Sequence, residues 1–105
     1  MLNQMILVGR LVSNPNVVEV GGEPIVETTI AIPRPYKNEE GVYETDLIPV
    51  TLKGGIATNT AEYCKKGDLV GVKGRLECMP EAVGDIKLSV VAEKVTFLSS
   101  KSNEN

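Results

Sequence analysis

The side-chain types of this chain and their spacing exclude most kinds of catalytic and metal-binding site. Histidine is absent, so the chain has neither an imidazole base nor a histidine-containing metal site. Cys64 and Cys78 are too far apart for a CxxC motif, and two thiols do not complete a tetrahedral zinc site. Asp46, Asp68 and Asp85 share no motif, and no phosphate-binding GxxxxGK[ST] run occurs. We therefore expect a protein that is not an enzyme, without a cofactor, and with two reduced and mostly buried thiols.

Basic side chains at outward positions of alternating segments are the remaining candidates for binding. Lys73 and Arg75 alternate with apolar residues in one such segment, Lys53 ends a second, and Arg10 interrupts the apolar face of a third. Each alone is more often a solubilising surface charge, but as a set on neighbouring strands they could line a phosphate-binding groove. The net charge of −3 and the pI of about 5.0 argue against indiscriminate binding of polyanions. A local basic groove stays compatible with them, because screening makes such a groove act at short range.

Alternation of apolar and polar residues with period two predicts five strands and one short extension. Their ranges are 4–13, 25–32, 46–53, 69–79 and 86–97, with the extension at 17–20. One helix is expected between the third and fourth strands, over 56–64, with Ile56, Thr60 and Tyr63 on one stripe and Gly67 as the left-handed residue that ends it. A single helix at this place is typical of the five-stranded oligonucleotide/oligosaccharide-binding (OB) barrel. This all-β fold commonly holds single-stranded nucleic acid or sugar chains on its open face.

Prolines and glycines predict where the strands end or bend. Pro33 and Pro35 cannot donate ladder hydrogen bonds, so the second strand should end there and 34–43 should form a polar, mobile loop. Gly71 and Gly74 are candidates for bulges, where a strand of a small barrel coils sharply.

The length of 105 residues predicts one OB domain over 1–98, followed by a disordered polar tail over 99–105. Phe97, near the end of the last strand, is expected in the core. No apolar run approaches the roughly 18 residues that cross a membrane. Met5–Val8 is too short for the core of a signal peptide. We therefore expect a cytoplasmic protein without a membrane partner.

Several segments, in order along the chain, resemble the bacterial single-stranded DNA-binding (SSB) proteins. They are Met1–Leu11 with the following Asn14-Pro15, Arg34-Pro-Tyr-Lys-Asn38, Ala61–Gly67 with Val70–Leu76, and Val91–Leu98. The resemblance runs from Met1 to about Leu98. It implies a homotetramer built as a dimer of dimers, in which the first strand contributes to subunit pairing. The apolar residues on both faces of that strand agree, because an exposed apolar face tends to find a partner.

The resemblance also implies which residues contact single-stranded DNA (ssDNA). Tyr36 stands where the family has an aromatic residue that stacks on a base, and Arg34 and Lys37 flank it. Tyr43 could stack as well, or it could pack in a hairpin stem. Leu47 occupies an outward position that is usually Phe or Trp in the family. Among the basic residues named above, Lys53 occupies a position that is often aromatic or basic.

The chain departs from the family pattern in its aromatic residues, its hairpin and its end. It has no tryptophan, aromatic residues make up only 4%, and 77–85 is acidic where the family is basic and aromatic. Each stacked base contributes roughly 1–3 kcal/mol, so we expect weaker, more electrostatic and more salt-sensitive binding than is usual for the family. The sequence ends at Ser102–Asn105 without the family's acidic, Phe-terminated tip, which recruits other enzymes. For a complete chain, the resemblance then implies that this recruitment is missing.

The expected function is sequence-independent binding and protection of ssDNA in replication, recombination or repair, through a basic groove with few stacking aromatics. Replication or recombination proteins are further candidate partners. The alternative is an OB-fold adaptor or assembly protein with little affinity for ssDNA, which the acidic hairpin and the missing aromatics would favour.

Overall fold

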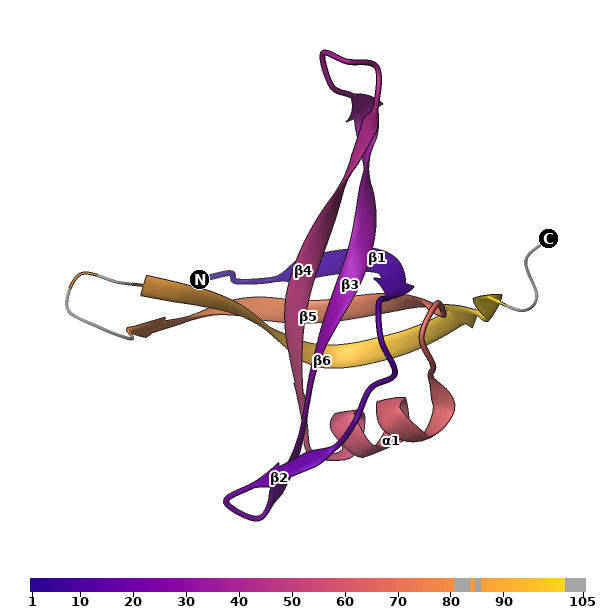
Figure 1. Ribbon diagram of the computed structural model, residues 1–105. Helices are drawn as coiled ribbons and strands as arrows, with labels where there is room; N and C mark the ends of the chain where they lie inside the picture. The colour runs from indigo at the N-terminus through magenta and orange to yellow at the C-terminus, as the bar shows by residue number, and fades with distance from the viewer. Residues whose placement is uncertain (81–83, 85, 102–105) are drawn as a thin grey trace.

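The computed structural model describes residues 1–80, 84 and 86–101 of the chain, and it confirms an all-β OB barrel with one short helix. The elements are β1 (Met5–Leu11), β2 (Val18–Val20), β3 (Glu23–Lys37), β4 (Tyr43–Lys53), α1 (Gly55–Tyr63), β5 (Leu69–Pro80) and β6 (Ile86–Ser99). The strand order is β1-β5-β6-β4-β3-β2, and pairing of β1 with β3 closes the barrel. The five predicted strands correspond to β1, β3, β4, β5 and β6, and the predicted extension to β2 (Figure 1).

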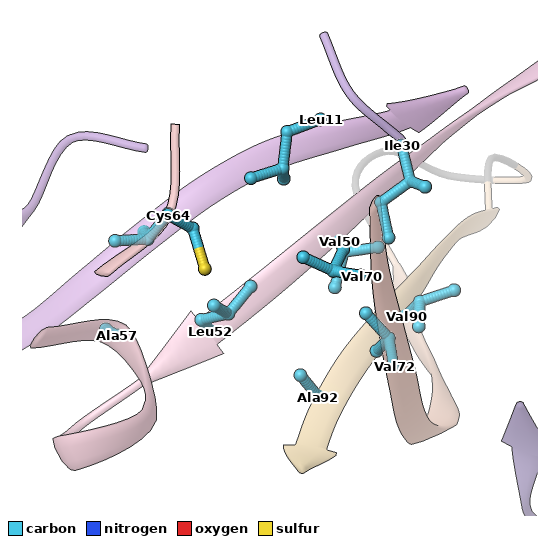
Figure 2. Packing of buried hydrophobic residues seen from close by; sticks show 11 residues of the cluster. Leu11, Ile30, Val50, Leu52, Ala57, Cys64, Val70, Val72, Val90 and Ala92 are labelled. Atoms are coloured by element: carbon cyan, nitrogen blue, oxygen red, sulfur yellow. The ribbon is translucent and has the colours of Figure 1, made fainter. Parts of the chain in front are cut away.

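The core lies inside the barrel and consists of aliphatic side chains at alternate strand positions (Figure 2). Its largest fully buried members are Ile30, Leu52, Val26, Val50 and Val70. The helix covers the barrel with Ala57, and Cys64 just beyond it is buried in the same cluster. β1 packs closely against β3 at Gly9, where a Cβ would lie only 2.4 Å from Ile30 Cγ2.

The prediction that Pro33 and Pro35 end the second strand is wrong. β3 continues through both prolines to Lys37, and β4 begins at Tyr43, so only 38–42 of the predicted loop 34–43 is a loop. The two strands project from the barrel as a two-stranded hairpin, here called the arm (residues 33–45; Figure 1). A two-stranded ribbon has open edges, where the missing N–H donor of a proline is tolerated. The ladder is nevertheless irregular between Pro33 and Lys37.

β5 and β6 form a second long ribbon, which leaves the barrel in another direction (Figure 1). Lys73 pairs with Lys94 and Gly74 with Ala92, so Glu93 is an extra residue on β6. Gly74 allows the close approach, since a Cβ there would lie 2.4 Å from the carbonyl oxygen of Val91. The expected irregularity at Gly74 is therefore present, and its extra residue belongs to the partner strand.

The predicted helix stripe is correct at Thr60, which is buried, and at Ile56, which packs against the core, but wrong at its third residue. The buried residues of α1 are Ala57 and Thr60, and Cys64 continues this spacing of three and four. Tyr63 is 69% exposed, so its assignment to the buried stripe is wrong. Gly67 has the expected positive φ of 90°, but it lies in the turn towards β5, because α1 already ends at Tyr63.

Two further residues expected in the interior are exposed. Phe97 keeps 49% of its surface accessible near the end of β6. Cys78 is exposed, because it lies where β5 has left the barrel and pairs with the equally exposed Leu88. The expectation of two buried thiols therefore holds for Cys64 only.

The end of the chain is described as far as Lys101, whose side-chain carbons lie over Gly67. Ser99 still belongs to β6. The remaining residues of the expected tail, 102–105, and most of the acidic hairpin tip, 81–83 and 85, lie outside the described residues. Within the described part of the chain, no helix has the length and the apolar character needed to cross a membrane.

Candidate nucleic-acid interface

One face of β4 points away from the core and is exposed except at the half-buried Thr51, and we call it the β4 outer face. Val50 and Leu52 point into the barrel and are 1% exposed, so the alternate residues point outward. These are Tyr43, Thr45, Leu47, Pro49, Thr51 and Lys53. At about 3.3 Å per residue the face is roughly 33 Å long, which is enough for several nucleotides of an extended strand. Leu47, near its middle, is 63% exposed.

The arm carries two tyrosines and a lysine, of which Lys37 and Tyr43 lie at one end of this face. Tyr36 is the neighbour of Lys37 along β3 and shares by strand alternation the other face with Arg34. Tyr36 is 61% exposed and Tyr43 is 55% exposed, so both rings are accessible. Lys37 is the ladder partner of Tyr43, which places the two side chains on the same face. Its Nζ lies 5.7 Å from the centre of the Tyr43 ring, a cation–π contact. A base that stacks on Tyr43 would therefore have its phosphate close to a cation.

The tip of the arm is ordered by its own hydrogen bonds. The side-chain oxygen of Asn38 accepts hydrogen bonds of 2.9 Å from the backbone N–H groups of Glu40 and Val42. Gly41 supplies the positive φ of 80° that this tight connection needs. The tyrosines are thus carried by a hairpin with a defined turn.

A groove of about 490 Å³ lies at the other end of the β4 outer face, against β5 and β6. Its charged lining residues are Lys53, Lys87, Glu27 and Glu77. Hydroxyl groups line it as well, and Thr51 Oγ1 lies 3.4 Å from the hydroxyl oxygen of Ser89. Among the described residues the groove is therefore of mixed charge, whereas the sequence predicted a basic one.

Arg34 lies on the face of the arm that is opposite to the β4 outer face. Its Nη2 donates to Asp46 Oδ1 at 2.9 Å and its Nη1 to Glu44 Oε2 at 2.7 Å. Both carboxylates alternate with the residues of the β4 outer face, so they point the other way. Asp46 raises the pKa of Arg34 the most, with smaller contributions from Tyr36 and Glu44. The hydrogen bond from Arg34 in turn lowers the pKa of Asp46.

Arg75 is also engaged by two carboxylates. Its Nη2 pairs with Glu77 and its Nη1 lies 3.3 Å from Glu93 Oε2. The hydrogen bond and charge of Glu77 raise the pKa of Arg75, and Glu93 adds to the shift. Because Glu77 lines the groove, Arg75 acts there by compensating a carboxylate.

The structure does not bring the other two basic candidates to the groove. Arg10 donates from Nη1 to the carbonyl oxygen of Gly67 at 3.0 Å, beyond the end of α1. Lys73 lies between Ile6 of β1 and Lys94 of β6, and β6 separates it from β4. Of the predicted set, the β4 outer face thus unites Lys37, Tyr43, Leu47 and Lys53, and Tyr36 lies on the same arm.

Lys87 and Glu27 are groove residues that sequence reasoning missed. A signal for Lys87 exists in the alternation of the last strand, where it shares a face with Ser89 and Val91, which also line the groove. Glu27 shares its face with Thr51, its ladder partner. Recognising its place required the pairing of β3 with β4.

Comparison with known proteins decides the family. Residues 2–98 match the model of the single-strand binding protein family. The chain belongs to this family. Among single-strand binding proteins, it is 42% identical to single-stranded DNA-binding protein 1 of Clostridium acetobutylicum, over 95% of this chain and 96% of the relative. It is 38% identical to single-stranded DNA-binding protein B of Bacillus subtilis, over 99% of this chain and 96% of that protein.

Solved structures of a single-strand binding protein have the same fold. A deletion mutant and the wild-type single-stranded DNA binding protein of Thermus aquaticus superpose with TM-scores of 0.77 and 0.76, at 28% and 26% identity. The matches cover 96% of this chain, which spans about half (52%) of each Thermus chain. Membership of the single-strand binding protein family agrees with the expectation that the chain is not an enzyme, and it does not favour the adaptor alternative.

Proposed function

We propose that this protein binds ssDNA without sequence preference and protects it during replication, recombination or repair. The observation that carries the proposal is the continuity of the accessible Tyr43 and its ladder partner Lys37 with the outer face of an OB-barrel strand, with a second accessible tyrosine, Tyr36, on the same arm. Family membership gives independent support, because the similar proteins named above are single-stranded DNA-binding proteins. Binding of ssDNA agrees with the expected cytoplasmic location of the protein.

Sequence-tolerant binding needs flat side chains that stack on bases and cations that follow the phosphates. In the proposed complex, Tyr36 and Tyr43 stack on bases, and Leu47 offers an apolar contact between them and the groove. Lys37 and Lys53 contact phosphates at the two ends of the β4 outer face. Lys87 adds a cation to the groove that the sequence-based set lacked.

The charge distribution limits the electrostatic part of the affinity. Glu27 and Glu77 line the same groove as Lys53 and Lys87, so few cations are left to neutralise phosphates. For single strands, log affinity changes with log salt concentration with a slope of about −0.7 per neutralised phosphate. The two lysines of the β4 outer face and its arm, Lys37 and Lys53, then give a slope of about −1.4 per subunit, and we expect binding that is detectable at low salt and weak at moderate salt.

Binding of labelled oligo(dT) at several salt concentrations tests the proposal. We expect a measurable isotherm at low salt, and a roughly 5- to 150-fold loss of affinity in Tyr36→Ala, the range that one lost stack of about 1–3 kcal/mol gives. Tyr63→Ala is the matched control, because Tyr63 is equally exposed but lies on α1. Absence of binding at low salt would refute the proposal and favour the adaptor.

We also propose that the protein is a homotetramer, a dimer of dimers. β1 pairs with β3 only at Arg10 and Leu11, so its edge from Met5 to Val8 has no partner strand on that side in the described part of the chain. Ile6 is 72% and Val8 is 49% exposed on this strand. An open edge with apolar side chains fits pairing with a second copy. Light scattering should give about 45 kDa for four chains of 11.3 kDa, and a monomer mass would refute this part.

A further inference from the structure

A hollow of about 590 Å³ lies beside β2, and we call it the β2 hollow. It is lined by Ser13, Asn14, Asn16, Val18, Val20, Ile25 and Glu27. β2 is the outermost strand of the sheet, and a two-residue turn at Gly21 and Gly22, with positive φ angles of 59° and 82°, joins it to β3. In Figure 1 this hairpin projects from the barrel at the end opposite to the arm. The β2 hollow therefore lies at a projecting edge of the molecule.

The side of the hollow formed by β2 and β3 is apolar. Val18 is 62% exposed and Val20 is 58% exposed. Val18 is the ladder partner of Ile25, so the three side chains lie on one face of this two-stranded ribbon. Apolar surface gains free energy when it is removed from water, in proportion to the area covered. An apolar side chain of a partner would cover these three residues.

Two carboxylates flank the apolar side chains on the same face. Glu23 is the ladder partner of Val20, and Glu27 follows Ile25 by two positions, so the two carboxylates lie on either side of Ile25 along β3. Both are exposed. At about 3.3 Å per residue, the four steps from Glu23 to Glu27 correspond to roughly 13 Å. The hollow thus combines an apolar centre with two negative charges at a fixed separation.

The cation next to this face does not neutralise the two carboxylates. Lys53 is the ladder partner of Ile25, but it lines the groove and not the hollow. Within the described part of the chain, Lys53 forms no ion pair with Glu23 or Glu27. The carboxylates repel phosphates, so ssDNA does not fit the hollow, whereas a cationic partner complements it.

We propose that the β2 hollow docks an extended, basic segment of a partner protein. An apolar side chain of that segment contacts Val18, Val20 and Ile25. A lysine or arginine two positions before it and another two positions after it pair with Glu23 and Glu27. In an extended segment these three side chains share a face, and the two cations are about 13 Å apart, which matches the carboxylates. The proposal goes beyond binding of ssDNA and does not depend on it.

NMR titration of the isotope-labelled protein with synthetic peptides tests the proposal in the absence of DNA. The probe is the end-capped peptide GSKTLTKSG, which has a cation, an apolar residue and a cation at alternate positions. The control peptide GSETLTESG reverses the charges, and GSKTSTKSG lacks the apolar side chain. The variant Glu23→Gln/Glu27→Gln is compared with Glu39→Gln/Glu40→Gln, which removes the same charge at the tip of the arm. A dispersed spectrum shows that each variant is folded.

We expect the probe to shift the backbone signals of Val18, Val20 and Ile25 saturably, and both control peptides to bind at least about threefold more weakly. Two exposed ion pairs contribute roughly 2- to 30-fold in affinity, so Glu23→Gln/Glu27→Gln should lose about this much. Glu39→Gln/Glu40→Gln should stay close to the wild type.

Three kinds of result would overturn the proposal. The first is the absence of a saturable shift at millimolar probe, or shifts centred outside the β2 hollow. The second is an equal loss of affinity in the two double variants, because net charge would then explain the binding. The third is a different occupant: shifts of the same signals on addition of oligo(dT) would assign the hollow to ssDNA, and shifts on dilution of the protein alone would assign it to a second copy.

Discussion

Replacing Arg34 by methionine should weaken ssDNA binding without changing its salt dependence. Arg34 was expected from the sequence to contact phosphate, but its guanidinium group engages Asp46 and Glu44 on the face of the arm that points away from the β4 outer face. We infer that Arg34 is a positioning residue. It holds β3 against β4 and thereby fixes Tyr36, which lies two residues further along the same strand.

The expected loss of ssDNA affinity in Arg34→Met follows from the ladder between β3 and β4. Pro33 pairs with Thr45 and Lys37 with Tyr43, and no ladder partner is found for the residues between Pro33 and Lys37. The ion pairs of Arg34 replace the ladder there, so their removal should release Tyr36. The loss of affinity should not exceed that of Tyr36→Ala, roughly 5- to 150-fold. A lost phosphate contact, in contrast, would make the slope of log affinity against log salt less negative by about 0.7.

The assay is a salt series of oligo(dT) isotherms for Arg34→Met, Lys37→Met, Tyr36→Ala and the Arg34→Met/Tyr36→Ala double variant. We expect the slope of the wild type in Arg34→Met, a less negative slope in Lys37→Met, and no further loss when Arg34→Met is added to Tyr36→Ala. A shallower slope in Arg34→Met, or additive losses in the double variant, would show that Arg34 contacts the DNA itself. The urea midpoint should change little in Arg34→Met, because the arm lies outside the barrel core.

Three further predictions concern the barrel and its titratable groups. Leu52→Ala should lower the free energy of unfolding by about 2–5 kcal/mol in urea titrations, because Leu52 is 1% exposed in the core; a loss under about 1 kcal/mol would contradict this packing. A thiol reagent should modify Cys78 rapidly and Cys64 only on unfolding, because burial raises the pKa of Cys64 and shields it; equal rates would be the contrary result. NMR titration should place the pKa of Asp46 below the ordinary 3.8, so that its ion pair is intact above that pH and is lost on acidification through the lowered pKa. In Arg34→Met the pKa should return towards 3.8, and an unchanged value would refute the coupling.

Much of the fold could be predicted from local pattern. Alternation located all the barrel strands, because burial of one face imposes a period of two on the sequence. The error at Pro33 and Pro35 arose because the rule against proline applies to strands with partners on both sides, whereas the arm is a ribbon with open edges. The helix stripe was wrong only at Tyr63, because Cys64, just beyond the last helical residue, takes the core position that was assigned to it.

The candidate site was only partly predictable for a different reason. The face shared by Leu47 and Lys53 follows from parity within one strand, and the structure shows both on the β4 outer face. The ion pairs of Arg34 depend on the register between two strands, and the place of Lys73 depends on the strand order around the barrel. Neither the register between strands nor the strand order can be obtained from the alternation of a single segment. For the same reason the mixed charge of the groove emerged only when β3, β4, β5 and β6 were placed together.

Photocrosslinking of a short iodouracil-substituted oligo(dT), about 8 nucleotides long, tests the central claim most directly, since iodouracil couples to aromatic rings that stack on it. Tyr36 and Tyr63 are 61% and 69% exposed, so accessibility alone would label them alike. If ssDNA lies along the β4 outer face and its arm, peptide mapping should find the crosslink at Tyr36 or Tyr43 and not at Tyr63. Equal labelling of Tyr36 and Tyr63, or labelling of Tyr63 alone, would contradict the proposed binding surface.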